Sequence, residues 1–255
     1  MKAKVLSLLV VIGLLILNLL GVGYGTTQQD TLTIVTWNIK HGNGHLDWQQ
    51  EQLEMIGADI CLLQEVDEYT DRVNGVSTLE ILSGRNYYYQ YFGNNGGYQN
   101  GEYGTGILSK RRFTKFEPSP LIEEGVHNGI IKGTLRRGGQ TFSLYNVHLS
   151  SESDTYRAKQ LEVLLQSFEE DENPCKIIAG DFNIRDLSEL ALFEEYGIVN
   201  TDEHYYPTYQ GLDWDTQAID NVIYTDDTLE VQQVDMLVNG LSDHNALTVT
   251  FQILE

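Results

Sequence analysis

Basic residues are scarce in this chain of 255 residues. It holds 16 lysines and arginines against 37 aspartates and glutamates, which gives a net charge of −21. Lys2 and Lys4 are the only charged residues before Asp30, so removal of the start would make the remainder more acidic still. Tight, sequence-independent binding to a polyanion depends on lysine and arginine contacts with phosphates. The composition therefore disfavours that kind of binding and suits an extracellular protein or a binder of cations.

Cysteine is also rare, and linkers, low-complexity tracts and repeats of fixed period are missing. Cys61 and Cys175 each lie in or beside an apolar, strand-like run. We expect buried thiols, while a disulfide would require a proximity that the sequence does not give. With 41% apolar residues, the length suits one large domain.

The start of the chain has the composition of a targeting segment. A basic start is followed by an apolar core over residues 5–20 and then by small residues up to Gly25. We expect residues 1–25 to be a signal peptide and residues 26–255 to form a single extracellular domain. The alternative is an uncleaved N-terminal anchor that holds the domain on the outer face of the membrane.

A carboxylate and a carboxamide follow one strongly apolar run. The run over residues 175–178 leads into Ala179-Gly180-Asp181-Phe182-Asn183. Side chains two positions apart in an extended chain point the same way, so Asp181 and Asn183 can face one site. An ordinary turn, which such residues also favour, remains the alternative.

Other strand-like runs end in the same way. Asn38 follows the β-branched run over residues 31–37, Glu65 ends the apolar run over residues 59–65, and His148 ends the run over residues 142–147. Asp243 and His244 precede the closing run over residues 247–254. Each residue alone is as easily structural, but the repetition favours a shared site.

The remaining pattern interleaves helices with these strands, which predicts an α/β domain. Helices are expected near residues 48–56 with Asp47 as cap, 78–82, 154–170 and 187–196. The aromatic cluster over residues 87–92 predicts a strand with one face on the core, followed by a loop rich in glycine and asparagine through Gly101. Stacking on bases or contact with lipid are the alternatives for the cluster.

Seven short motifs, in order along the chain, resemble those of the endonuclease/exonuclease/phosphatase superfamily, which is deoxyribonuclease I-like. They are Thr36-Trp37-Asn38-Ile39, Leu63-Gln64-Glu65, Tyr103-Gly104 through Leu108-Ser109, Asn146-Val147-His148-Leu149, Gly180-Asp181-Phe182-Asn183, Ile219-Asp220 and Ser242-Asp243-His244. The resemblance implies an α/β (α+β) fold: a four-layer α/β/β/α sandwich of two mixed sheets face to face with outer helices.

The resemblance also implies a metal site. It assigns Glu65 as the principal ligand, with Asn38 and Asp243 completing or bordering the site. Oxygen donors without a thiolate favour a hard ion, Mg²⁺ or Mn²⁺. Such an ion screens the negative charge of a phosphodiester during attack by water.

Further roles follow from the same resemblance. Asp181 would orient and deprotonate the attacking water, and Asn183 would help to hold water or phosphate. His148 and His244 would bind the phosphoryl oxygens. Each imidazole needs a carboxylate to fix its tautomer, and the resemblance supplies Asp220 for His244 and Glu102 for His148.

The sequence therefore predicts a secreted, Mg²⁺-dependent hydrolase of phosphodiester bonds that acts as a monomer without a protein partner. An endonuclease-like enzyme acting on nucleic acid is the first interpretation. A sphingomyelinase-type or other phospholipid phosphodiesterase or phosphatase, with transient membrane contact, is the alternative. A noncatalytic binding protein on the same fold is the third, because fold alone does not fix function.

Overall fold

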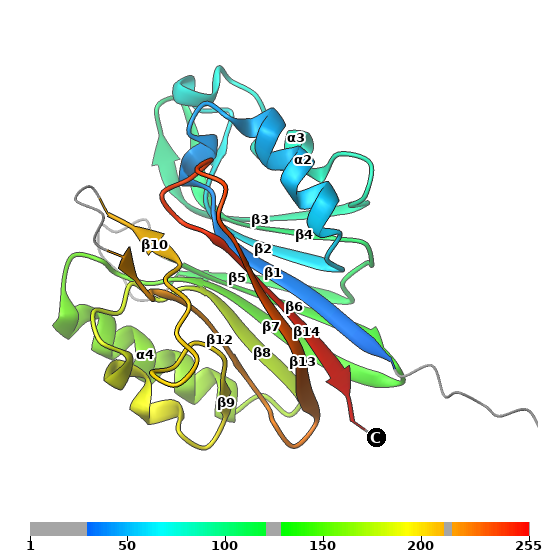
Figure 1. Ribbon diagram of the computed structural model, residues 1–255. Coiled ribbons are helices and arrows are strands. Elements are labelled where there is room, and N and C mark those ends of the chain that lie inside the picture. Colours follow the sequence, from blue (N-terminus) through cyan, green and yellow to red (C-terminus); the bar gives the residue numbers. More distant parts are fainter. Residues whose placement is uncertain (1–29, 121–128, 212–215, 255) are drawn as a thin grey trace, which may run out of the picture. The chain divides into compact units, whose positions relative to one another are not determined.

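Apolar and β-branched runs far apart in the sequence fold into two six-stranded sheets (Figure 1). The computed structural model describes residues 30–120, 129–211 and 216–254, so the leader expected at residues 1–25 lies outside the described residues. The described residues from Thr31 onward belong to one compact unit. No helix among them is both long and apolar enough to span a bilayer.

The first sheet has the strand order β13-β14-β1-β2-β4-β3. β1 and β2 are parallel, and all other neighbours are antiparallel. Its strands are β1 (Thr31–Asn38), β2 (Ile60–Glu68), β3 (Tyr89–Tyr98), β4 (Gly101–Ser109), β13 (Leu229–Leu237) and β14 (Ala246–Ile253).

The second sheet has the order β5-β6-β7-β8-β12-β9 and again contains one parallel pair, β7 with β8. Its strands are β5 (Lys115–Pro120), β6 (Gly129–Arg137), β7 (Gln140–His148), β8 (Cys175–Asp181), β9 (Gly197–Ile198) and β12 (Asp220–Tyr224). A separate two-stranded hairpin consists of β10 (Tyr209–Gln210) and β11 (Thr216–Gln217).

Helices cover the outer face of each sheet, which gives four layers (Figure 1). α2 and α3 pack on the first sheet, whereas α4 and η3 pack on the second. The bounds are η1 (Lys40–Gly42), α2 (Leu46–Ile56), η2 (Asp71–Val73), α3 (Thr78–Ser83), α4 (Asp154–Glu169) and η3 (Leu187–Phe193). The α/β/β/α sandwich predicted from the resemblance is confirmed.

Strand β1 shows why these runs are apolar on both faces. Leu32 and Ile34 belong to the core between the two sheets, while Val35 and Trp37 belong to the core beneath α2 and α3. Successive side chains point to opposite faces, and both faces are covered, so the run is nearly continuous. The strand ends that carry the polar residues are therefore held by packing on two sides.

Several details differ from the sequence expectations. Residues 93–98 continue β3 instead of forming a loop, because they pair with β4 across a bulge between Asn94 and Gly96. The segment predicted as a helix over residues 187–196 is the 3₁₀ helix η3. His45, not Asp47, precedes α2, and Asp47 lies in its first turn.

The aromatic cluster and the cysteines serve the core. Tyr87 is buried, and the ring of Tyr91 stacks on Phe113 with centroids 4.6 Å apart. Tyr88 and Tyr89 are exposed, and the register Tyr89–Ser109–Ile60 places them at the end of the sheet opposite Glu65. Both cysteines are free and buried, as expected.

Candidate active site

Polar side chains from both sheets meet where strands end or begin. They surround a cleft of about 640 Å³, and the predicted site residues that line it are Glu65, His148, Asp181, Asn183, Asp243 and His244. Asn38 and Asp220 lie directly behind this wall, where they hydrogen-bond Asp181 and His244 respectively. Of the predicted site residues, Glu102 alone lies elsewhere.

Strand register places three of these residues side by side. In the parallel pair β7–β8, His148 stands opposite Asp181, and in the antiparallel pair β8–β12, Asp181 stands opposite Asp220. Three adjacent strands therefore present one row of side chains at the same edge. A shift by one residue would turn each side chain to the other face, so the row depends on the buried runs that fix the register.

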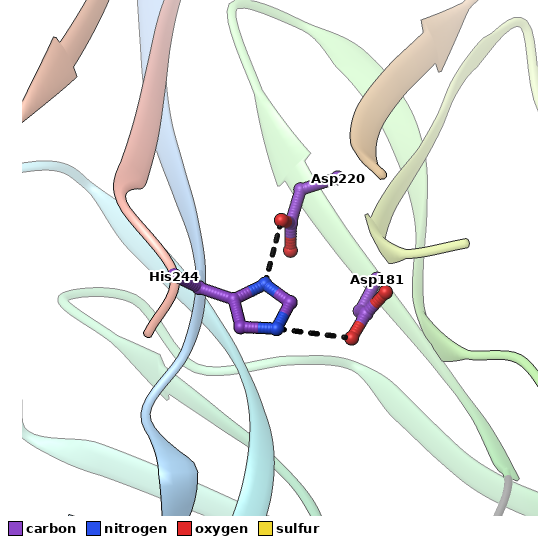
Figure 2. Close-up of side chains that lie close together, drawn as sticks. All are labelled: Asp181, Asp220 and His244. Carbon is purple, nitrogen blue, oxygen red and sulfur yellow. Dashed lines mark hydrogen bonds and ion pairs between the residues drawn. The ribbon is translucent and has the colours of Figure 1, made fainter. Parts of the chain in front are cut away.

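His244 connects two carboxylates of this row (Figure 2). Its Nδ1 lies 2.8 Å from Asp220 Oδ2, and its Nε2 lies 3.7 Å from Asp181 Oδ2. Burial opposes protonation of this imidazole, but Asp220 and Asp181 outweigh that effect and raise the pKa of His244 to about 10. His244 is consequently a cation at neutral pH.

Asp181 is the most enclosed carboxylate of the cleft, with 1% of its surface exposed. Its Oδ2 accepts a hydrogen bond from Asn38 Nδ2 at 2.9 Å and lies 3.7 Å from Nε2 of both His148 and His244. Burial raises the pKa of Asp181. A raised pKa makes this carboxylate a better proton acceptor than a solvated aspartate.

The predicted partnership between Glu102 and His148 is wrong. Among the described residues, His148 Nδ1 has no hydrogen-bond partner, and Glu102 accepts instead from Asn94 at 2.7 Å. Side chains alternate along β4, so Glu102 points to the face opposite that of its neighbour Tyr103, which lines the cleft. The prediction for His244 and Asp220 agrees with the hydrogen bond found between them.

Glu65 lies in β2 at a bulge between Leu63 and Val66 and has a left-handed backbone with φ of 54°. The bulge turns its carboxylate toward the cleft. Oε1 accepts from Asn38 Nδ2 at 3.2 Å, and His41 Nδ1 lies 3.5 Å from Oε2. Burial alone would raise the pKa of Glu65, but His41, His148 and Asn38 together lower it to about 2.

The oxygen donors around Glu65 fit a hard divalent cation. Glu65 is ionised throughout the physiological range and Asp243 lines the same cleft. Asn38 Oδ1 accepts from the backbone N–H of Lys40 at 3.0 Å, while its amide nitrogen faces the carboxylates. In this arrangement Asn38 orients Glu65 and Asp181, and its role as a metal ligand stays a prediction.

A second group of ligand atoms lies deeper. Oxygens of Asp181 and Asp220 and a nitrogen of His244 all lie within 4.8 Å of one another, close enough to hold a metal ion. His244 binds a metal only when neutral, and its raised pKa opposes that state. These three residues are therefore better described as a hydrogen bond from His244 to Asp220 and an ion pair between His244 and Asp181.

Several residues that the sequence did not single out also line the cleft. They are Tyr103, Ser151, Glu152, Arg185, Tyr209, Gln217 and Ile219. The ring of Tyr209 lies 5.0 Å from that of His244, and Arg185 is the one lysine or arginine on the described wall, ion-paired with Asp154 at 2.9 Å. Arg185 follows Asp181 by four positions. Its place close to that motif is the feature of the sequence that could have identified it as a cleft residue.

The chain matches the profile of the Endonuclease/Exonuclease/phosphatase family over residues 35–244. No curated protein matches it. Solved structures that share its fold include an endonuclease/exonuclease/phosphatase from Beutenbergia cavernae, D. rerio TDP2 complexed with a single-strand DNA product, and the human Nocturnin catalytic domain with a bound sulfate anion.

These likenesses are distant in sequence and extensive in structure. The match to the Beutenbergia protein has 17% sequence identity and a TM-score of 0.72, and it covers 88% of this chain and 72% of that protein's chain. The D. rerio protein is 20% identical with a TM-score of 0.70, covering 87% and 99%. The human domain is 22% identical with a TM-score of 0.71, covering 88% and 94%. By its profile match and its fold, the chain belongs to the endonuclease/exonuclease/phosphatase family of metal-dependent phosphoester hydrolases.

Proposed function

We propose that this protein is a secreted, Mg²⁺-dependent phosphodiesterase in which Asp181 activates the attacking water. One observation carries the proposal: the buried Oδ2 of Asp181 faces the amide of Asn38 and the Nε2 atoms of His148 and His244. A carboxylate set among donors holds a water in one orientation and accepts its proton. Asn183, which is fixed by Leu149 and Asp181, holds the water or the phosphate beside it.

The same residues suit the developing charge of the reaction. The protonated imidazole of His244, kept cationic by Asp220, presents an N–H to a phosphoryl oxygen. His148 presents its Nε2 from the neighbouring strand. A divalent cation held by Glu65, with Asp243 bordering it, would supply further positive charge at that phosphate when bound.

Nucleic acid is the substrate class that we favour. The D. rerio relative is complexed with a single-strand DNA product, and the human relative carries a sulfate, an anion similar in size and charge to a phosphate. Arg185 on the cleft wall is positioned to contact a phosphate next to the one that is cleaved. The net charge of −21 weakens long-range attraction to a polyanion, which suits short or single-stranded substrates better than duplex DNA.

A phospholipid phosphodiesterase is the competing proposal. The acidic composition favours it, because a zwitterionic head group is not repelled as DNA is. The exposed tyrosines Tyr88 and Tyr89 count against it, since they lie at the sheet end remote from Glu65 and do not border the cleft.

The test compares substrates under one set of conditions. Purified protein is incubated with single-stranded DNA, plasmid DNA and sphingomyelin vesicles, each with Mg²⁺ or with EDTA. We expect Mg²⁺-dependent cleavage of single-stranded DNA that Asp181→Asn abolishes and the exposed control Asp227→Asn retains. Faster turnover of sphingomyelin than of DNA would establish the competing proposal. If none of these phosphoesters is cleaved, the result favours the third interpretation, a noncatalytic binding protein on the same fold.

A further inference from the structure

Two amide side chains, Asn146 and Gln64, lie between the two sheets, and both are fully buried. Asn146 Nδ2 on β7 donates to the carbonyl of Leu63 on β2 at 3.0 Å and to that of Gly106 on β4 at 2.8 Å. Gln64 Nε2 on β2 donates to Asn146 Oδ1 at 2.7 Å. Three hydrogen bonds centred on Asn146 therefore join the second sheet to the first.

These bonds lie at the start of the bulge in β2. Leu63 and Gly106 form the last residue pair of β2 and β4 before the bulge. The bulge then places two residues of β2, Gln64 and Glu65, opposite one residue of β4. Because Asn146 donates to both carbonyls of the last pair, it holds the two strands at the point where the extra residue is inserted.

The bulge determines which way Glu65 points. Leu63 and Val66 both pack in the core beneath α2 and α3, although residues three positions apart in a regular strand point to opposite faces. Without the extra residue, Glu65 would point the same way as Leu63, into that core. The extra residue allows Gln64 to face the other sheet and Glu65 to face the cleft.

Apolar packing would not fix this arrangement. Around the two amides the core consists of apolar side chains such as Leu144, whose contacts have no preferred direction. A buried amide is costly unless its polar atoms are paired, and a hydrogen bond requires a defined distance and angle. The amides therefore fix one position of β7 along β2. They fix with it the separation of His148 and Glu65, which follow them on these strands by two residues and by one.

The backbone of Glu65 depends on such support. Its φ of 54° lies in the left-handed region, which a residue other than glycine adopts only where the surrounding structure enforces it. On the side of β1, Ile39 N donates to Gln64 O at 3.1 Å. On the side of the second sheet, the side chains of Asn146 and Gln64 supply the constraint.

We propose that Asn146 and Gln64 are positioning residues: they hold β2 in its bulged conformation and thereby aim the Glu65 carboxylate into the cleft, opposite His148. Both amides lie behind the described wall of the cleft, so they act on a substrate only through other residues. The inference rests on the proposed function only in that Glu65 binds a divalent cation. Loss of either amide should therefore weaken cation binding by more than its effect on stability accounts for.

The test compares two amide variants with an apolar variant of the same core. Asn146→Leu removes all three bonds between the sheets, and Gln64→Met removes one of them. Leu144→Ala, two positions before Asn146 on β7, opens a cavity in the same core and removes no hydrogen bond of a side chain. Circular dichroism and thermal unfolding establish that each variant is folded and how far it is destabilised.

Two measurements need no assay of activity. Calorimetry gives the Kd for Mn²⁺, and the ¹³Cα and ¹³Cβ chemical shifts of Glu65 in the metal-free protein distinguish a left-handed from an extended backbone. We expect the Kd to rise by about 10- to 100-fold in Asn146→Leu and by about 3- to 10-fold in Gln64→Met, with the Glu65 shifts moving toward extended values in both. In Leu144→Ala the Kd should change by less than about twofold, and the shifts should stay left-handed.

An unchanged Kd with left-handed shifts in folded Asn146→Leu would overturn the proposal, as would an equal loss of affinity in Leu144→Ala. If Asn146→Leu does not fold, Gln64→Met decides by the same two measurements. A native protein that binds no Mn²⁺, or that binds it and cleaves no phosphoester, would refute the proposed function. The Glu65 shifts of the variants would still decide whether the two amides hold the bulge.

Discussion

Asp181, the residue that we propose as the proton acceptor, differs from an ordinary aspartate in its burial. It lies at the end of a buried strand, next to two imidazoles and one amide, and its pKa is raised by loss of hydration. The neighbouring Glu65 is partly exposed, and its pKa is lowered to about 2 because His41, His148 and Asn38 outweigh the effect of burial. These opposite shifts in two carboxylates of one cleft support the proposal that Asp181 accepts a proton and Glu65 binds a cation.

The first prediction concerns Asp181. Asp181→Asn keeps the shape of the side chain but cannot accept a proton, so we expect kcat to fall by about 10³-fold. The exposed Asp227→Asn is the matched control. Mn²⁺ binding and the thermal midpoint are measured alongside, and a kcat within about threefold of the native value would exclude Asp181 as the base.

The second prediction concerns His244, whose pKa is raised to about 10. A raised folded-state pKa stabilises the fold fully below the unfolded value of about 6.5, and this contribution is lost as pH rises through about 10. We expect activity to persist through neutral pH and to decline toward pH 10. Asp220→Asn should move the decline to lower pH.

Nuclear magnetic resonance of the metal-free protein separates this titration from ionisation of metal-bound water. The imidazole signals of His244 should remain those of the protonated ring at pH 8. A midpoint near 6.5 for His244 in the folded protein would contradict the role assigned to Asp220.

The parallel pair β7–β8 is the element on which the row His148–Asp181–Asp220 depends. Gly180 stands opposite Val147 in this pair, and a Cβ at Gly180 would lie 2.0 Å from the carbonyl oxygen of Val147. The strands can therefore adopt this spacing only with glycine at that position.

The third prediction follows from that contact. Gly180→Ala must push β7 and β8 apart, so we expect a loss of about 2 kcal/mol or more in the free energy of unfolding, with kcat lowered because His148 and Asp181 are moved away from each other. Urea unfolding measures the change in the free energy of unfolding, and single-turnover kinetics measure the change in the catalytic rate. In the control Gly97→Ala the added Cβ meets nothing closer than 3.8 Å, and equal losses in both variants would show that the contact is unimportant.

At the scale of single helices and strands, the sequence predicted the buried strands well and the exposed ones poorly. The apolar run of β8 (Cys175–Asp181) and the amphipathic helix α4 (Asp154–Glu169) were recognised because packing on a core imposes a period on the sequence. The end of β3 was missed because its asparagines and glycines carry no strand propensity, and pairing with β4 alone makes it extended.

The site was predictable in part for the same reason. Residues at the ends of buried strands, such as Asn38 and His148, converge wherever the sheets are packed, so their motifs were informative. The direction of Glu102 depends on the pleat at the start of β4, where the strand is exposed, and the position of Lys40 depends on a left-handed turn. Neither the direction of one side chain nor a left-handed turn produces a periodic pattern in a single sequence.

At the scale of the whole molecule, net charge affects the rate at which a charged substrate reaches the cleft. The net charge of −21 repels a polyanion over distances up to the Debye length, about 30 Å at 0.01 M salt and about 8 Å at 0.15 M. Proteins that bind DNA through lysine and arginine lose affinity as salt rises. An acidic nuclease is expected to respond in the opposite direction.

The fourth prediction is that kcat/KM on single-stranded DNA rises by about 2- to 10-fold when NaCl is increased from 0.01 to 0.15 M at fixed, saturating Mg²⁺, because the salt screens the repulsion. The value of kcat/KM on a small phosphodiester that carries a single negative charge should respond much less. Rates measured on both substrates at each salt concentration provide the check, and a steep fall on DNA would indicate an unrecognised basic binding surface.

The cleft joins the first and last strands of the domain. Trp37 Nε1 donates to the carbonyl of His244 at 3.0 Å, and Ser242 Oγ donates to that of Asn38, although about two hundred residues separate the partners. Asp243 and His244 therefore reach the cleft only when β14 has docked beside β1. A chain in which this last pairing has not formed has an incomplete cleft, even if every other strand is in place.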